Sequence, residues 1–156
     1  PGITYRCVSD STHSQMVHPV EGLFINENAN MGDLKGTLIE FCKQFFNVQN
    51  LKVRFRPSYF PFTEPSAEMD IAYEIVNNKI QLGQGDRWLE ILGCGMVNPI
   101  VLENCNVDTN TYQGFAFGVG LDRITMLKYG LTDIRSFFSG NLNWIASNGF
   151  TIGDFE

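Results

Sequence analysis

"GFAFGVGLDRITMLKYG", residues 114–130, holds two kinds of local structure side by side. Its glycines at 114, 118 and 120 match neither the G-x-x-x-x-G-K-[ST] nor the G-x-G-x-x-G spacing, so neither of these phosphate-binding loops is predicted. The aromatic and β-branched residues between the glycines favour a strand over 114–120. The residues from Leu121 favour a helix, which Gly130 would end as a C-cap. The stretch therefore predicts a strand that runs directly into a helix.

The rest of the chain mixes long strand patterns with one clear helix pattern. Strands are predicted over 3–8, 17–25, 51–62, 67–76 and 87–97, and an apolar stripe predicts a helix from 33 to 46. The first two strands are expected to form a long antiparallel hairpin, and Pro19 places the second at a sheet edge or bulge. The strands over 67–76 and 87–97 are expected to pair across a turn-rich spacer. Antiparallel strands with helices between and after them predict an α+β fold and disfavour a parallel Rossmann or P-loop sheet.

Composition narrows the function classes. The 156 residues suffice for one sizeable core, and 44% hydrophobic and 18% charged residues are typical of a globular domain. A net charge of −6 argues against a domain that holds nucleic acid by charge alone. No apolar run long enough for a membrane span and no signal peptide are found, so a cytoplasmic protein is expected. The chain starts abruptly in strand-like residues without Met, which suggests a fragment of a longer polypeptide.

The four cysteines and two histidines do not form a metal-binding pattern. Cys7, Cys42, Cys94 and Cys105 include no C-x-x-C pair, and His13 and His18 lie far from most of them. A zinc site is therefore disfavoured, and four reduced thiols are expected.

Two arginines and one glutamate are candidates for ligand contacts. Arg6 and Arg123 are either surface or ion-paired residues, or two guanidinium groups that hold a triphosphate from two sides. Glu21 is either a solvent-facing strand residue or an acceptor for a ligand ammonium. The local sequence leaves these alternatives open.

The stretch "YFPFTEP", residues 59–65, is unusual for a strand because it holds two prolines and three aromatic residues. Phe60 and Phe62 either belong to the core or present ring edges to an apolar ligand. Nearby carboxylates, most of them expected to be solvated, are Glu64, Glu68, Asp70 and Glu90. A magnesium site would need only one or two of them together with phosphate oxygens.

Three segments in this order resemble a known enzyme family. Residues 5–23, "YRCVSDSTHSQMVHPVEGL", resemble the motif 2 hairpin of class II aminoacyl-tRNA synthetases. "RFRPSYFPFTEPSAEMD" (54–70) and "GFAFGVGLDRITMLKYGLTDIRSFF" (114–138) are similar to the signature and motif 3 of bacterial phenylalanyl-tRNA synthetase alpha subunits, which "WLEILGCGMVNP" (88–99) also matches. The resemblance reaches about Leu142. It implies the class II catalytic fold, an antiparallel sheet flanked by helices, with residues 1–156 as the C-terminal part of the catalytic domain and motif 1 missing.

The same resemblance implies an activity and its partners. Phenylalanine would be activated with ATP and Mg²⁺ and then transferred to tRNA(Phe). The family works as an alpha2beta2 heterotetramer, so a beta subunit is the expected protein partner. Without the motif 1 region, the fragment alone is expected to be inactive.

The resemblance also implies a role for individual residues. Arg6 would hold the α-phosphate of ATP, Arg123 would meet the γ-phosphate and lie against the adenine, and His13 would reach toward the pyrophosphate end. Gly118 and Gly120 would keep side chains away from ATP.

On the amino-acid side, Glu21 would bind the ammonium group of phenylalanine. Phe60 and Phe62 would line the side-chain pocket, with their edges toward the substrate ring, and Ala116 would form its base. Glu90, with Glu64 as a second candidate, would contact magnesium or the ribose.

One departure from the family leaves a second function open. Val17-His18-Pro19 stands where the family usually has Phe-His-Gln. The chain thereby lacks a ring that would stack on adenine and an amide that would bond the substrate amino group. A non-catalytic synthetase-like binding or assembly module is therefore the alternative to an active synthetase. The presence of Arg6, Glu21 and Arg123 favours the active enzyme, and an unrelated ATP-binding enzyme would require all three segment matches to be accidental.

Overall fold

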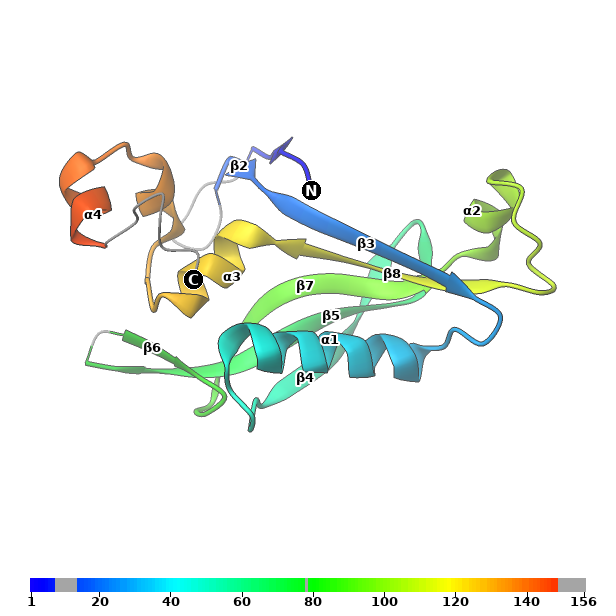
Figure 1. Ribbon diagram of the computed structural model, residues 1–156, viewed down its shortest axis with the longest axis horizontal. Coiled ribbons are helices and arrows are strands. Elements are labelled where there is room, and N and C mark those ends of the chain that lie inside the picture. The colour runs from blue at the N-terminus through cyan, green and yellow to red at the C-terminus, as the bar shows by residue number, and fades with distance from the viewer. Residues whose placement is uncertain (8–13, 78, 149–156) are drawn as a thin grey trace.

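A six-stranded antiparallel sheet forms the centre of the computed structural model, which describes residues 1–7, 14–77 and 79–148 (Figure 1). Five strands follow the order β3-β8-β7-β5-β4, and β6 pairs with β5. The strands are β3 (Pro19–Asn26), β4 (Val53–Phe60), β5 (Thr63–Val76), β6 (Lys79–Leu82), β7 (Arg87–Val97) and β8 (Gln113–Gly120). Every pairing is antiparallel. The predicted α+β class and the predicted pairing of 67–76 with 87–97 are thus confirmed.

The antiparallel hairpin predicted at the start of the chain is present, but the prediction that it is long is wrong. Only β1 (Thr4–Tyr5) and β2 (Met16–Val17) pair with each other, and residues 8–13 lie outside the described part. After His18 the chain changes partner, and β3 pairs along its whole length with β8, from Pro19 opposite Gly120 to Asn26 opposite Gln113. The partner of β3 is about a hundred residues away in the sequence, so local periodicity could not identify it. The edge position predicted from Pro19 is confirmed, because β3 ends the order of strands.

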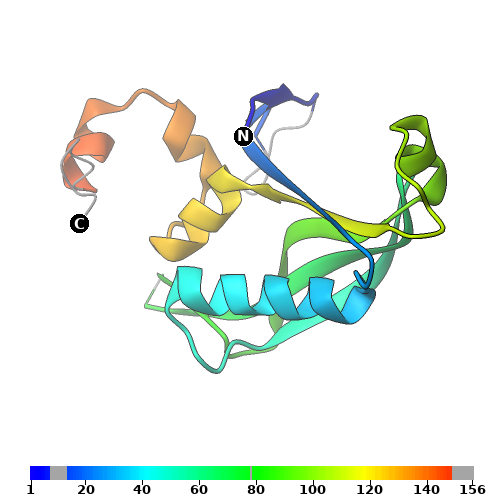
Figure 2. The same ribbon diagram turned by 45° about the vertical axis from the view of Figure 1, so that its right-hand side comes forward.

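The predicted amphipathic helix is α1 (Met31–Phe46), which lies across one face of the sheet (Figure 2). The side chain of Asn30 accepts hydrogen bonds from the backbone N–H groups of Gly32 and Asp33 and so caps the first turn. Asn47, with φ 54°, ends the helix in the left-handed conformation. The predicted stripe is only partly buried, since Leu34, Leu38 and Cys42 have at most 1% exposure and Phe41 has 38%.

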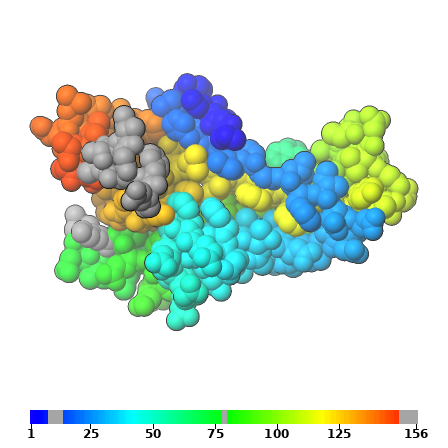
Figure 3. Space-filling model, in the orientation of Figure 1, coloured from blue at the N-terminus to red at the C-terminus, as the bar shows by residue number. Residues whose placement is uncertain are grey.

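The strand-to-helix transition at residue 120 is confirmed. β8 ends at Gly120 and α3 (Leu121–Lys128) begins at the next residue, and Gly130 has φ 67°. Four elements were not predicted from the sequence. They are β6, which falls in the spacer between β5 and β7, and α2 (Pro99–Asn104), the 3₁₀ helix η1 (Ile134–Phe138) and α4 (Leu142–Ser147). The helices α2 and α4 lie at opposite ends of the long axis (Figures 1 and 3).

The core lies between α1 and one face of the sheet. Its most buried members include Leu34 and Leu38 from α1, Met69 and Ile71 from β5 and Phe115 from β8. On β4, Val53 and Phe55 pack against this core while the alternate residues point to the opposite face. That opposite face carries polar side chains and positions the site. Among the described residues, no helix is both long and apolar enough to cross a membrane.

Candidate functional site

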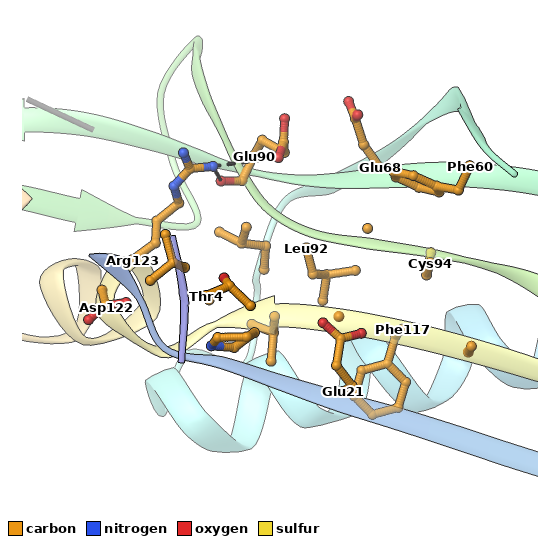
Figure 4. Close-up of a pocket in the computed structure, with 18 of the residues that line it drawn as sticks. Thr4, Glu21, Phe60, Glu68, Glu90, Leu92, Cys94, Phe117, Asp122 and Arg123 are labelled. Carbon is orange, nitrogen blue, oxygen red and sulfur yellow. Dashed lines mark hydrogen bonds and ion pairs between the residues drawn. The ribbon is translucent and has the colours of Figure 1, made fainter. Parts of the chain in front are cut away.

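A cavity of about 610 Å³ lies on the face of the sheet opposite α1 (Figure 4). It is bordered by residues of β1, β3, β4, β5, β7, β8 and α3. The predicted site residues that line it are Arg6, Glu21, Phe60, Phe62, Glu90, Ala116, Gly118, Gly120 and Arg123. His13 lies outside the described residues, and Glu64 does not line the cavity. Residues from four separate sequence segments therefore meet at one place.

One row of paired residues crosses the floor of this cavity. Arg56 is paired with Glu68, Glu68 with Gly93, Gly93 with Gly118, and Gly118 with Glu21. Directly opposed residues of antiparallel strands face the same side of a sheet. The row therefore has two adjacent glycines at its centre and a carboxylate on either side of them.

Glu21 reaches the cavity from the edge strand β3. Its carboxylate lies above Gly118, because a Cβ built on Gly118 would be 2.7 and 2.9 Å from the two carboxylate oxygens. A Cβ on Gly120 would instead meet only Val17, at an ordinary 3.8 Å. The space above Gly118 is thus taken by the carboxylate of Glu21, a candidate for binding the amino-acid substrate, and is not left open for ATP.

The two phenylalanines come from the tight turn between β4 and β5. Their rings are stacked, with centroids 6.0 Å apart and an interplanar angle of 11°. The hydroxyl of Ser66 holds this turn, since it accepts from the backbone N–H of Phe60 and donates to the carbonyl of Thr63. Phe62 is 54% exposed, so the core alternative does not apply to it. Both rings border the cavity.

Arg123 projects from the first turn of α3 toward Glu90 of β7 (Figure 4). Its Nη1 donates to the backbone carbonyl of Glu90 at 2.7 Å and lies 3.5 Å from the Glu90 carboxylate. Arg56 approaches the same carboxylate at 3.8 Å. The guanidinium of Arg123 is therefore held at the cavity wall before any ligand is bound.

Arg6 borders the cavity at the end of β1, with an exposed side chain. Its backbone N–H donates to the carbonyl of Gln15 at 2.8 Å, which extends the β1–β2 ladder by one residue. Thr4 of the same strand also borders the cavity (Figure 4). The two predicted phosphate-binding arginines thus line one cavity.

The carboxylates expected near these strands differ in their surroundings. Asp70 is only 1% exposed, so the expectation that most would be solvated is wrong for it. It accepts hydrogen bonds from Nε of Arg54 at 2.7 Å and from Nε of Arg56 at 2.6 Å. Burial opposes ionisation of Asp70, but the hydrogen bonds from the two arginines outweigh it and hold its pKa below the ordinary value. The alternation of Arg54 and Arg56 on one face of β4 was the available signal for this pair.

Glu64 and Glu90 are not brought together. Glu64 lies on β5 six residues before Asp70, which is the strand partner of Glu90. At the rise of an extended strand this is about 20 Å. Among the described residues, no group of three or more His, Cys, Asp or Glu could hold a metal ion. The remaining candidate at the cavity is Glu90, whose side chain is 45% exposed.

A contact that the sequence interpretation missed ties β3 to α3. The backbone N–H of His18 donates to Oδ2 of Asp122 at 2.7 Å, and Nδ1 of His18 lies 2.8 Å from Oδ1. The imidazole also stacks on Phe138, with centroids 6.1 Å apart and rings nearly parallel. Asp122 borders the cavity and precedes Arg123. An acidic residue in the first turn of a predicted helix was the only sequence signal.

All four cysteines are free in the structure. Burial raises the pKa of Cys42 to about 12 and that of Cys94 to about 11. Cys94 borders the cavity, but a thiol with so high a pKa is a poor nucleophile at neutral pH.

The cavity therefore offers two chemically different ends. Figure 4 shows Arg123 and Glu90 at one end and Glu21 and Phe60 toward the other. The first end suits phosphate groups, and the second suits a ligand with an ammonium group and an apolar ring. The sequence shows no Ser-His-Asp arrangement for covalent catalysis. A cavity with these two ends can instead act by orienting its ligands and by stabilising charge.

Known proteins match this chain over nearly its whole length. The family model of the tRNA synthetases class II core domain (F) matches residues 1–148. The phenylalanine–tRNA ligase alpha subunit of Afipia carboxidovorans is 58% identical over 150 residues, which are 96% of this chain and 42% of that protein. The corresponding subunit of Methylobacterium radiotolerans is 59% identical over the same shares of the two chains. The chain thus spans about two fifths of the length of these relatives.

A solved structure supports the fold independently. The crystal structure of pyrrolysyl-tRNA synthetase from Desulfitobacterium hafniense matches with a TM-score of 0.54 and 14% identity. The match covers 90% of this chain and 44% of that one. At this identity the likeness shows the fold alone.

Proposed function

The chain belongs to the family of class II tRNA synthetase core domains, and from that premise we propose that it is the catalytic part of a phenylalanine–tRNA ligase alpha subunit. The proposed reaction joins phenylalanine to ATP, giving phenylalanyl-adenylate and pyrophosphate, and then transfers the phenylalanyl group to a terminal ribose hydroxyl of tRNA(Phe). Relatives named for this enzyme, with 58% and 59% identity, support the assignment.

The proposal rests chiefly on the set of residues that line one cavity. Arg6 and Glu21 from residues 5–23, Phe60 from 54–70 and Arg123 from 114–138 line the same space. Two permanently charged guanidinium groups suit the phosphates of ATP. A carboxylate and an aromatic ring suit the ammonium and side chain of phenylalanine.

In the adenylation step, a carboxylate oxygen of phenylalanine forms a bond to the α-phosphorus of ATP, and the bond to the pyrophosphate oxygen breaks. Arg6 would stabilise negative charge on the α-phosphate, and Arg123 would bind the γ-phosphate. Glu21 would hold the ammonium group so that the carboxylate is directed at phosphorus. The reaction needs no covalent nucleophile from the protein, because orientation and charge stabilisation lower its barrier.

On the side-chain end, Phe60 and Phe62 would contact the substrate ring and Ala116 would leave room for it. Each aromatic contact contributes about 0.5–1.5 kcal/mol beyond burial. Ala116 is the cross-strand partner of Gly95 and Leu23, in the row next to the two central glycines. A small residue at this place fits the proposed base of the ring pocket.

A divalent cation fits this site through Glu90. Magnesium takes one or two protein carboxylates together with phosphate oxygens and water, and the half-exposed carboxylate of Glu90 stands at the phosphate end of the cavity. When bound, Mg²⁺ would neutralise charge on the phosphate oxygens.

The proposed partners follow from the proposed reaction. They are tRNA(Phe) and a beta subunit in an alpha2beta2 assembly, in the cytoplasm where tRNA is charged. An acidic chain with a charge of −6 does not attract RNA by its overall field, so further contacts with tRNA are expected outside this chain.

Aminoacylation of tRNA(Phe) tests the proposal. The complete alpha chain that carries this sequence would be assembled with its beta partner and compared with an Arg123→Ala variant. We expect activity in the first and a loss of about 10²–10³ in the rate in the second, the usual cost of removing one charge-stabilising donor. Arg87→Ala is the matched control, because Arg87 is exposed at the start of β7 and does not line the cavity.

One observation favours a second candidate, a non-catalytic binding or assembly module. Val17 and Pro19 line the cavity, and their side chains offer neither a hydrogen bond nor an aromatic ring. If the assembled wild-type protein does not charge tRNA(Phe), this second function replaces the first.

A further inference from the structure

Gly93 and Gly118 are direct cross-strand partners at the centre of the cavity floor. Both are interior strand residues, where glycine weakens a strand unless something approaches its backbone closely. The approaching groups come from strands at the two ends of the main strand order. Glu21 belongs to β3 and Phe60 to β4.

The carboxylate of Glu21 takes the space that a side chain at position 118 would fill. A Cβ there would lie 2.7 and 2.9 Å from the two carboxylate oxygens. These oxygens are the far end of a flexible side chain, so an alanine would displace the carboxylate and leave the backbone in place. The residue at 118 therefore controls where the charge of Glu21 lies.

The ring of Phe60 takes the equivalent space above Gly93. A Cβ at position 93 would lie 2.8 Å from Cζ and 3.1 Å from Cε2 of that ring. Phe60 is also stacked on Phe62, so its ring is restrained from a second side. An alanine at 93 would shift the tip of the ring.

We propose that Gly93 and Gly118 are specificity-determining positions that set the separation between the Glu21 carboxylate and the Phe60 ring. Opposed Cα atoms of antiparallel strands are about 4.5–5.5 Å apart, so the two positions over which the Glu21 carboxylate and the Phe60 ring lie are one cross-strand spacing apart. An aromatic α-amino acid carries its ring one methylene away from the carbon that bears the ammonium, which matches such a short separation.

This inference rests on the proposed function and changes the role of one residue. Gly118 acts on the amino-acid substrate through Glu21, rather than on ATP as the resemblance implies. The two glycines are positioning residues, because they touch Glu21 and Phe60 and need not touch substrate.

Phenylalanine-dependent pyrophosphate exchange by the complete alpha chain, assembled with its beta partner, tests this inference. For Gly118→Ala we expect the KM for phenylalanine to rise about 10- to 100-fold, the loss of one hydrogen bond to a charged group. The KM for ATP and the Tm stay at the wild-type values. Gly93→Ala should raise the same KM without changing that for ATP. Gly36→Ala is the matched control, since a Cβ on Gly36 would meet nothing within 4 Å.

A shorter side chain at position 21 or 60 should partly restore the phenylalanine affinity lost by an alanine at 118 or 93. Glu21→Asp withdraws the carboxylate by one methylene, so the pair Gly118→Ala and Glu21→Asp should raise the KM for phenylalanine less than the product of the two single effects. Phe60→Leu combined with Gly93→Ala should behave in the same way. An unchanged KM in Gly118→Ala, or single effects that simply multiply, would overturn the inference while wild-type activity stands. A wild-type protein without phenylalanine-dependent exchange would overturn the proposed function and this inference with it.

Discussion

His18 and Asp122 join the start of the edge strand β3 to the first turn of α3. One carboxylate oxygen accepts from the backbone N–H of His18 at 2.7 Å, and the other lies 2.8 Å from Nδ1 of the imidazole. The next residue along α3 is Arg123, which contacts Glu90 of β7. Through these contacts the segment that carries Glu21 and the helix that carries Arg123 keep a fixed relation across the cavity.

Removal of the Asp122 carboxylate should destabilise the protein. Asp122→Ala leaves the N–H of His18 without its acceptor in a partly buried position, which costs about 1–3 kcal/mol. Urea unfolding measures the change. Asp86→Ala is the matched control. The Asp86 carboxylate is fully exposed and its ion pair with Lys52 is long, at 3.9 Å, and such surface pairs contribute little to stability. Equal midpoints for the Asp122→Ala and Asp86→Ala variants would contradict the role of this contact.

Asp70 should contribute to stability in a pH-dependent way. Its pKa is lowered in the folded state, so its contribution is complete above the unfolded pKa of about 4 and is lost as the pH falls toward the folded pKa. Wild-type stability should therefore fall more steeply between about pH 5 and pH 3 than that of Asp70→Asn. Urea midpoints across this range measure the difference, and parallel curves for the two proteins would refute it.

Asp70→Ala should also be destabilising at neutral pH. It removes the acceptor of Arg54 and Arg56, and a hydrogen bond to a charged group contributes about 1.5–3 kcal/mol. Both arginines retain exposed side chains that water can solvate, so the loss should be near the lower end of this range. Unfolding at pH 7 checks the value, and a variant as stable as the wild type would show that the buried carboxylate is not needed.

Gly36→Ala should stabilise the protein. Gly36 lies on the exposed side of α1, and a Cβ there would meet no other atom within 4 Å. Alanine is favoured over glycine in a helix interior by up to about 1 kcal/mol. A higher Tm is expected, and a lower one would mean that α1 is not formed as described.

The secondary structure could be predicted where the signal is local. Alternation along β4 and the helical stripe of α1 each reflect one buried face, and the transition at Gly120 follows from its own sequence. The partner of β3 could not be predicted, because a strand pairing across many residues leaves no mark in either strand alone. β6 pairs locally with β5, from Lys79 opposite Val76, but its four residues lie in the stretch that was predicted as a turn-rich spacer. The class II fold expected from the resemblance is confirmed by the family model over residues 1–148.

The features of the site also divide into those that the local sequence could predict and those that depend on how the strands pair. Arg6, Glu21, Phe60 and Arg123 could be selected from their motif positions, and the structure places all four around one cavity. The alternation of Arg54 and Arg56 was a local signal, but the burial of Asp70 between them depends on the register of β4 with β5, which the sequence does not give. The contact between Gly118 and Glu21 likewise depends on the pairing of β8 with β3, which only the folded chain brings about.

The most direct test of the central claim is pyrophosphate exchange by the assembled complete enzyme with each amino acid added separately. Phenylalanine should stimulate exchange with the highest kcat/KM, since the Phe60 and Phe62 rings favour an aromatic side chain. Leucine should be a much weaker substrate. Equal stimulation by leucine and phenylalanine, or none by phenylalanine, would contradict it.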